Sequence, residues 1–208
     1  MPALYYTDIR DLSEDASYTS LISSARLQKM QRYRRPQDRL RSLAAALLLQ
    51  HLFGSDAAIL ENDFNKPYIS GDLHFNLSHS GDFVILLCAK SEVGCDIEKH
   101  GIKDFDGIAA KILHPLELEY YNSHKSVETF YKFWTLKESY LKCIGTGFHL
   151  APASFCINLS EQISLLETPQ KDFKECTFQI INHLTNYTIA TCIKGVALTN
   201  LSLEQIHF

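Results

Sequence analysis

The sequence predicts an α+β fold made of two small α/β units packed together. A helical pattern followed by a strand pattern occurs twice along the 208 residues, a length that suits one large domain or two small ones. The apolar content is 46% and Pro and Gly are sparse, which is typical of an ordinary globular protein. We expect the two units to be residues 1–92 and 93–208, with the boundary just before Gly94.

The first unit begins with helices. Residues 19–53 have a helical pattern that is interrupted at Pro36, and proline can open a second helix because the first turn leaves its N–H groups unpaired. Apolar residues recur at three- and four-residue spacing until Gly54, where we expect this helix to end. Strands are expected next, in the alternating stretch at residues 74–77, the continuous apolar run at 83–89 and the short segment at 93–97.

The second unit repeats this order. Ser126 is expected to cap a long helix that reaches about Ile144 and ends at Gly145, and Pro115 is expected to open a shorter helix. Further strands are expected over residues 154–159, 173–181 and 187–193, where β-branched and aromatic residues return. The long helix carries a predicted buried stripe that consists of Phe130, Phe133, Trp134, Leu141 and Ile144.

Composition excludes several classes of function. The net charge of −4 argues against a general nucleic-acid binder. No apolar run is long enough to span a membrane, and the N-terminus lacks the layout of a signal peptide, so we expect a cytoplasmic protein with no membrane partner. The six cysteines include no CxxC motif, and the nine histidines include no HExxH motif. We therefore expect reduced core cysteines and look for a metal site among the carboxylates.

Asp96 and Glu98 in the segment VGCDIEK form the first candidate metal site. They lie two residues apart on a predicted strand, so they project from one face with Cα atoms roughly 6.6 Å apart. One divalent cation can bridge this spacing, and paired oxygen ligands suit Mg²⁺, which completes its shell with waters and substrate phosphates. For an isolated DxE pair, however, a solvated strand face is the more common explanation.

The segment FWTLKESYLK favours the metal interpretation. Glu138 and Lys142 lie four residues apart and therefore share one face of the predicted long helix, while Lys137 lies about 100° away. Such pairs are usually exposed and contribute little energy. Here the pair lies beside the stripe that contains Trp134, and charges close to a buried surface need partners.

Residues 26–41 are strongly basic. They hold seven Lys or Arg side chains against Asp38 alone, which gives seven minus one, or +6, in a protein of net charge −4. Such asymmetry is typical of a site for an anionic ligand or partner, although a solvated amphipathic helix has the same composition. RNA binding is an alternative, but the aromatic and glycine motifs of common RNA-binding modules are absent nearby.

Ser78 and His79 in the segment FNLSHSGDF leave a predicted strand and enter a turn of small residues. They are a poor nucleophile and base for a hydrolase, because adjacent strand residues point to opposite faces and no GxSxG motif surrounds the serine. Donation to phosphate oxygens is the better functional interpretation, and simple turn hydrogen bonding is the structural one.

Taken in order, these segments resemble the 4'-phosphopantetheinyl transferases of the surfactin-synthetase-activating type, the double-length monomeric class of that superfamily. The resemblance covers most of the chain: the basic stretch through RLRSL, then NKP, FNLSHSGD, VGCDIEK and FWTLKESYLKCIGTGF. Its specificity comes from the combination of VGCDIEK with FWTLKESYLK about forty residues later. It implies two similar α/β halves with pseudo-twofold symmetry, with coenzyme A and Mg²⁺ in the cleft between them.

The resemblance also implies an activity and its residues. The enzyme would move the 4'-phosphopantetheine arm of coenzyme A onto a serine of an acyl or peptidyl carrier protein and release 3',5'-adenosine bisphosphate. The metal ligands would be Asp96, Glu98 and Glu138. Glu138, or a water that it orients, would accept the serine proton, and Lys142 would contact the phosphates as the second catalytic residue. Three converging carboxylates need such a cation, because they otherwise raise one another's pKa.

The other site residues follow from the same matching. The 3'-phosphate of coenzyme A would be held by Arg26, Lys29, Arg41 and His79, with Lys66 by the adenine and Ser78 by the diphosphate. Glu117 matches an acidic position that helps to close the site. Asn65 replaces the family's glycine before Lys-Pro, a change that asparagine tolerates because it adopts left-handed backbone relatively easily.

Two other functions stay open at this point. One is a different Mg²⁺-dependent phosphoryl-transfer enzyme that acts on nucleotides, although no GxxxxGK[ST] loop or kinase motif is present. The other is a non-catalytic adaptor that binds carrier proteins, which the intact set of acidic residues and Lys142 argues against. The carrier could serve fatty-acid, polyketide or nonribosomal peptide synthesis. The apolar cluster of Ile112, Leu113 and Leu116 is interpreted either as its docking surface or as core.

Overall fold

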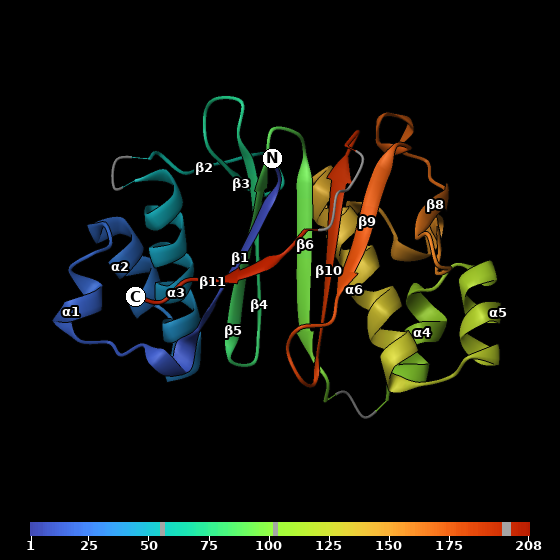
Figure 1. Cartoon of the computed structure of the whole chain (residues 1–208), viewed down its shortest axis with the longest axis horizontal. Coiled ribbons are helices and arrows are strands. Elements are labelled where there is room, and N and C mark those ends of the chain that lie inside the picture. Colours follow the sequence, from blue (N-terminus) through green and yellow to red (C-terminus); the bar gives the residue numbers. More distant parts are fainter. Residues whose placement is uncertain (55–56, 102–103, 197–200) are drawn as a thin grey trace.

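The computed structural model describes residues 1–54, 57–101, 104–196 and 201–208, with the backbone alone at residue 148. Helices flank two central sheets on either side, with α1 to α3 beside one sheet and α4 to α6 beside the other (Figure 1). The N-terminal part contains β1 (Ala3–Asp8), α1 (Ala16–Thr19), α2 (Ser24–Gln31), α3 (Pro36–Phe53), β2 (Leu60–Glu61), β3 (Pro67–Tyr68), β4 (His74–Ser80) and β5 (Phe83–Ala89).

The C-terminal part contains β6 (Val93–Lys99), α4 (Phe105–Ile112), α5 (Pro115–Ser123), α6 (Val127–Ile144), β7 (Cys156–Asn158), β8 (Ser164–Glu167), β9 (Cys176–Ile181), β10 (Tyr187–Lys194) and β11 (Leu203–Gln205). Short 3₁₀ turns lie at Ile9–Asp11, Gly147–His149, Pro152–Ser154 and Lys171–Phe173.

The two parts have the same connectivity. Each runs from a strand through three helices and a small two-stranded pair into a hairpin, and in each the first strand pairs antiparallel with the last strand of that hairpin. The first sheet has the order β11-β1-β5-β4 and the second has the order β6-β10-β9. The helices α3 and α6 are both 18 residues long. The prediction of two similar α/β halves with pseudo-twofold symmetry is thus confirmed.

The strand β11 departs from this repetition. It comes from the C-terminal end of the chain, yet it pairs in parallel with β1 of the first sheet. The last residues therefore cross from the second sheet back to the first and tie the two halves together.

The predicted boundaries of the two long helices are confirmed, whereas the helix expected from residue 19 up to Pro36 is divided into α1 and α2. α3 starts at Pro36 and is capped by Gly54. α6 starts after Ser126, whose hydroxyl accepts a hydrogen bond from the backbone N–H of Thr129 at 3.0 Å. It ends at Gly145, which has a φ of 79° and so adopts the left-handed conformation that glycine takes without steric cost.

The continuous apolar run of β5 is explained by burial on both faces. Val84 and Leu86 pack in the core under α3, while Ile85 and Leu87 pack in a second core shared with β6 and β10. A strand that is buried on both faces has no polar side, so its sequence does not alternate. The outer face of the second sheet is covered by α6.

Polar side chains of β4 join the two sheets. Every second residue of this strand accepts a hydrogen bond from the backbone of β6, as the pleat of a strand requires. The side-chain oxygens of Asn76, Ser78 and Ser80 accept from the N–H groups of Cys95, Ile97 and Lys99 at 2.9, 3.4 and 3.0 Å. This junction places the serines of FNLSHSGD next to the carboxylates of VGCDIEK.

The apolar cluster at residues 112–116 is divided between core and surface. Leu113 is buried and Ile112 packs on the same core beneath α4 and α6, so the interpretation of these two residues as a docking surface is wrong. They form the inner side of an amphipathic segment. Leu116 on α5 is 49% exposed. None of the helices in the described residues combines the length and apolar content of a membrane span.

Candidate active site

Six of the predicted site residues come together between the two halves. Asp96 and Glu98 on β6 and Glu138 and Lys142 on α6 line one cavity of about 410 Å³. Its remaining lining residues are Leu77, Ser78 and His79 on β4 and Trp134 on α6. The predicted cleft between the halves is therefore present, and we call it the carboxylate cavity.

Gly94 allows α6 to approach β6 closely enough to form this cavity. A Cβ atom at this position would lie 2.0 Å from the Ser139 carbonyl oxygen and 2.4 Å from the Cys143 backbone nitrogen, both on α6. No side chain fits there. Because β6 alternates, Gly94 shares its face with Asp96 and Glu98, so the helix that packs on the glycine brings Glu138 to the same place.

We expect Gly94→Ala to lower the free energy of unfolding by about 1–3 kcal/mol, since inserted core atoms force the backbone apart. The shape of the carboxylate cavity should also change, because α6 can no longer pack at the same distance from β6. Gly101→Ala is the matched control, because its added methyl group meets no atom of the described residues within 4 Å. Denaturant unfolding of the two variants checks this, and equal unfolding midpoints would contradict the packing role of Gly94.

Asp96 is the most buried of the three carboxylates, with 3% of its surface exposed. Its Oδ1 atom accepts hydrogen bonds from Lys142 Nζ at 2.6 Å and from Ser78 Oγ at 2.8 Å. Its Oδ2 atom is buried and has no hydrogen-bond partner among the described residues. An unpaired carboxylate oxygen is costly to bury, so this atom is oriented to receive a cation or a donor that the chain itself does not supply.

Glu98 is held in place from both halves of the molecule. Ser80 Oγ donates to its Oε2 atom at 2.9 Å, and Trp134 Nε1 donates to its Oε1 atom at 3.3 Å. Burial and the nearby charge of Asp96 raise the pKa of Glu98 above its usual value. Ser80 was not predicted to be a site residue. The polar residues at alternate positions of FNLSHS indicate that Ser80 shares a strand face with Ser78, and Ser80 could have been predicted from this pattern.

Glu138 has the most strongly shifted carboxyl group of the cavity. Burial, followed by the charge of Asp96, raises the pKa of Glu138 to about 7. Burial alone would lower the pKa of Lys142, but the charge of Asp96 outweighs it and the pKa is raised. The cavity thus contains a fixed ammonium group and a carboxyl group that exchanges its proton near neutral pH.

The carboxylates share one cavity without being tightly clustered. In the described parts of the chain, the one group of three His, Cys, Asp or Glu donors that all lie within 4.8 Å of one another is formed by cysteines. The oxygens of Asp96, Glu98 and Glu138 are therefore spaced more widely. Their donor set is nevertheless all oxygen, as Mg²⁺ requires, and Asp96 Oδ2 is unpaired. The residues fit a hard divalent cation.

A second, basic cavity adjoins the first. It has a volume of about 230 Å³ and is lined by Arg26, Lys29, Tyr33, Asp38, Arg41, Ser42, Ala45, Leu49, Glu61, Asn65, Pro67, Leu77 and His79. Leu77 and His79 line both cavities, so the two share a wall. The four residues predicted to hold a phosphate are thus brought together at this cavity.

The basic groups of this cavity are partly engaged already. Arg41 donates to the Asp38 carboxylate and to the Gly81 carbonyl oxygen, both at 2.6 Å, which leaves further N–H groups of its five. Burial lowers the pKa of Arg26 from its usual value. Desolvation, followed by the charges of Arg41 and Lys142, lowers the pKa of His79. An anion that bound here would relieve this mutual repulsion.

Lys66 lies outside both of these cavities. Its Nζ atom pairs with Glu92 at 2.9 Å and donates to the carbonyl oxygens of Val93 and Cys143. It lines a third cavity of about 390 Å³, which shares Pro67 with the basic cavity. The preceding Asn65 has a φ of 61°, so the expected left-handed backbone is confirmed.

The expected role of Glu117 in closing the site is wrong. This carboxylate is 2% exposed and pairs with Lys137 at 2.7 Å, away from the carboxylate cavity. It also accepts hydrogen bonds from the backbone N–H groups of His114 and Ile157, both at 2.7 Å. Glu117 therefore caps α5 and anchors it to β7 and α6, which is a structural role. The residue type alone does not show whether a glutamate is structural or catalytic.

A basic cavity beside a cavity with three carboxylates and a lysine is an arrangement that suits a ligand with phosphate groups. Comparison with known proteins agrees. The profile of the 4'-phosphopantetheinyl transferase superfamily matches residues 92–192, which include all three carboxylates and Lys142. The 4'-phosphopantetheinyl transferase psf-1 of Bacillus pumilus is 30% identical over 181 residues, which cover 80% of this chain and 76% of that protein.

Two further relatives match over most of their length. The 4'-phosphopantetheinyl transferase gsp of Aneurinibacillus migulanus is 29% identical over 90% of this chain and 83% of its own. The 4'-phosphopantetheinyl transferase Sfp of Bacillus subtilis (strain 168) is 28% identical over 86% of this chain and 85% of its own. The chain therefore belongs to the 4'-phosphopantetheinyl transferase superfamily. The resemblance found in the sequence motifs is confirmed at the level of family and enzyme class.

Proposed function

We propose that this chain transfers the 4'-phosphopantetheine group of coenzyme A to a serine of an apo acyl or peptidyl carrier protein and releases 3',5'-adenosine bisphosphate. The observation that carries the proposal is the shared wall of Leu77 and His79 between a basic cavity and a carboxylate cavity. Coenzyme A has two separate anionic groups, a 3'-phosphate and a diphosphate, and a ligand that spans this wall can place one in each cavity.

We assign the diphosphate to the carboxylate cavity. Asp96, Glu98 and Glu138 would hold Mg²⁺ there, and the bound ion would neutralise the charge that builds on the leaving bisphosphate. Ser78 and Lys142 lie at the same cavity, where Lys142 Nζ donates to Ser78 Oγ at 2.9 Å. They would supply a hydroxyl donor and an ammonium donor for phosphate oxygens. Lys142 would stabilise the phosphoryl group during transfer.

In the proposed reaction the carrier serine oxygen attacks the phosphorus atom that bears the pantetheine arm. A new P–O bond forms to serine while the P–O bond to 3',5'-adenosine bisphosphate breaks in line with it. The serine proton passes to Glu138 or to a water that Glu138 orients.

We assign the 3'-phosphate to the basic cavity, where Arg26, Lys29, Arg41 and His79 supply the cationic donors. The adenine would lie near Pro67, which lines both the basic cavity and the third cavity. Lys66, which lines the third cavity, would lie beside it. We further propose that residues 1–92 and 93–208 act as two rigid units of a monomer around this ligand, with β11 as the tie between them.

Incubation of the protein with an apo carrier protein tests the proposal against its nearest alternative. With coenzyme A and Mg²⁺, the intact mass of the carrier should rise by one phosphopantetheine. With ATP in place of coenzyme A, it should stay unchanged. Modification from ATP would indicate a different phosphoryl-transfer enzyme, and binding of the carrier without modification from either donor would indicate an adaptor.

Leu116 is the one residue of the apolar cluster that stays available to a carrier protein. We expect Leu116→Asp to raise the KM for the carrier without changing that for coenzyme A, because the side chain is 49% exposed on α5 and lies outside the three cavities. Leu21→Asp is the control, since Leu21 is 46% exposed near α2 in the other half. Steady-state kinetics with each substrate varied separately checks this. Equal changes in both KM values would contradict docking at Leu116.

A further inference from the structure

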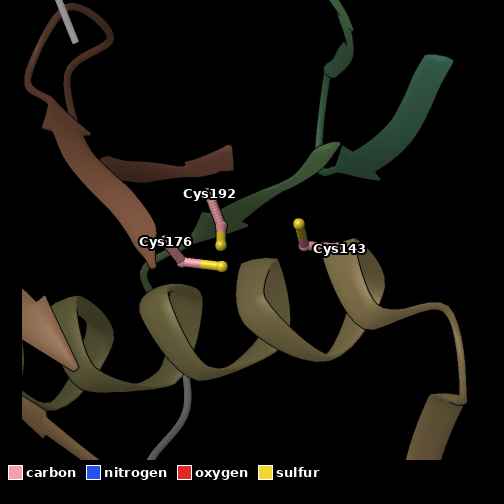
Figure 2. A group of neighbouring side chains, drawn as sticks. All are labelled: Cys143, Cys176 and Cys192. Atoms are coloured by element: carbon pink, nitrogen blue, oxygen red, sulfur yellow. The ribbon is translucent and has the colours of Figure 1, made fainter. Parts of the chain in front are cut away.

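Three cysteines that are far apart in the sequence converge in the second half of the molecule. The sulfur atoms of Cys143 on α6, Cys176 on β9 and Cys192 on β10 all lie within 4.8 Å of one another, and Figure 2 shows the sulfur atoms of Cys176 and Cys192 side by side, with Cys143 next to them. The sequence led us to look for a metal site among the carboxylates alone, and this cluster adds a second candidate group. A search for CxxC motifs finds only cysteines that are close in the sequence. This cluster is formed by tertiary packing, so such a search does not find it.

The pairing of β9 with β10 and the packing of α6 create the cluster. Cys176 lies opposite Lys194, and Phe178 lies opposite Cys192, so the two cysteines are diagonal neighbours on one face of the sheet. Cys143 reaches the same face from α6. Cys143 and Cys192 are fully buried, and Cys176 is half-buried at the edge, so the cluster has one opening.

The three thiols interact with one another and with the backbone. Hydrogen bonding among them lowers the pKa of Cys176 and raises the pKa of Cys143, while burial raises the pKa of Cys192. Cys143 also donates to the Glu92 carbonyl oxygen at 3.3 Å. The thiolate is the form of cysteine that binds metals, so an ion that bound here would displace the thiol protons.

The donor set selects the kind of ion. Three sulfur donors with no nitrogen or oxygen ligand suit soft cations, of which Cu(I) and Zn²⁺ are the common biological examples. Structural zinc sites almost always have four protein ligands. In the described residues no fourth His, Cys, Asp or Glu joins the group within 4.8 Å. Three-sulfur coordination therefore favours Cu(I) over Zn²⁺.

We propose that Cys143, Cys176 and Cys192 form a three-thiolate binding site for a soft monovalent cation of the Cu(I) type. Binding would release the thiol protons and join α6, β9 and β10 through the ion. The site is separate from the carboxylate cavity, because Cys143 follows Lys142 directly on α6 and therefore points about 100° away from it.

Titration of the reduced full-length chain with Cu(I), under anaerobic conditions and against a chromophoric Cu(I) chelator, tests the proposal. We expect one Cu(I) per chain, and X-ray absorption should show three sulfur neighbours. Cys176→Ser replaces the half-buried member of the cluster and should weaken Cu(I) affinity by about a hundredfold or more, since even loss of an outer contact costs about 10–100-fold. Cys88→Ser is the matched control, a buried free cysteine outside the cluster.

The outcomes separate the possibilities. Unchanged Cu(I) affinity in Cys176→Ser, or an equal loss in Cys88→Ser, would overturn the proposal. If Cys176→Ser fails to fold, the number of sulfur neighbours that X-ray absorption finds around Cu(I) in the unmodified chain tests the proposal. Two sulfur neighbours, or no bound ion, would overturn the proposal. Tighter binding of Zn²⁺ than of Cu(I) would overturn the choice of ion. None of these readouts depends on transfer activity, so the proposed function stands or falls separately.

Discussion

Glu138→Gln and Asp96→Asn should each lose transfer activity while the protein stays folded. We expect kcat/KM to fall by about a hundredfold to a thousandfold or more, because removing even one preorganised hydrogen-bond donor from a reaction centre costs about 10²–10³. Each change keeps the volume of the side chain, so packing is preserved. Transfer to an apo carrier protein measures the loss, and circular dichroism and thermal unfolding establish that the variants are folded.

The control for this experiment is Glu128→Gln. Glu128 lies on the same helix as Glu138, but it is exposed and pairs with Lys132. This variant should retain full activity. Full activity in Glu138→Gln and Asp96→Asn as well would refute the assignment of the carboxylate cavity as the reaction centre.

Dephospho-coenzyme A should be a far poorer donor than coenzyme A. If Arg41 and His79 each make a charge-assisted hydrogen bond to the 3'-phosphate, each bond is worth about 1.5–3 kcal/mol, so the loss of both lowers kcat/KM by about a hundredfold or more. Binding energy from this remote phosphate would orient the diphosphate in the neighbouring cavity. Arg41→Ala should remove much of the difference in kcat/KM between the two donors, because the cavity would lose a side chain that binds the 3'-phosphate.

The matched control is Arg39→Ala. Arg39 lies two residues earlier on α3, but it pairs with Glu14 and does not line the basic cavity. The Arg39→Ala variant should therefore discriminate between coenzyme A and dephospho-coenzyme A as the unmodified enzyme does. Both donors must be compared at one salt concentration, because salt screens exposed arginines. Equal use of the two donors by the unmodified enzyme would leave the basic helix to be explained by docking of an acidic carrier protein.

The parts of the fold that local patterns determine were predictable. The proline and glycine boundaries of α3 and the serine cap of α6 are signals within a few residues, and the structure confirms them. The strands β1 and β11 were missed. β11 pairs with β1 from the other end of the chain, and β1 also pairs with β5 about eighty residues later, so no local pattern indicates these contacts.

The same distinction applies to the site. Asp96, Glu98, Glu138 and Lys142 were found because strand and helix periodicity placed them on shared faces, and the structure brings those faces together. Glu117 was misassigned because the sequence does not show its partner Lys137, which makes it part of the core. The three cysteines were judged scattered for the same reason, since their proximity depends on how α6 packs on β9 and β10.

The most direct test of the proposed function is to quantify both products of one reaction. An apo carrier protein is incubated with the enzyme, coenzyme A and Mg²⁺, and the intact mass of the carrier is measured alongside the nucleotide released. We expect one 3',5'-adenosine bisphosphate for each carrier that gains one phosphopantetheine, and neither product when the carrier serine is replaced by alanine. A carrier whose mass is unchanged, or whose mass rises without release of the bisphosphate, would contradict it.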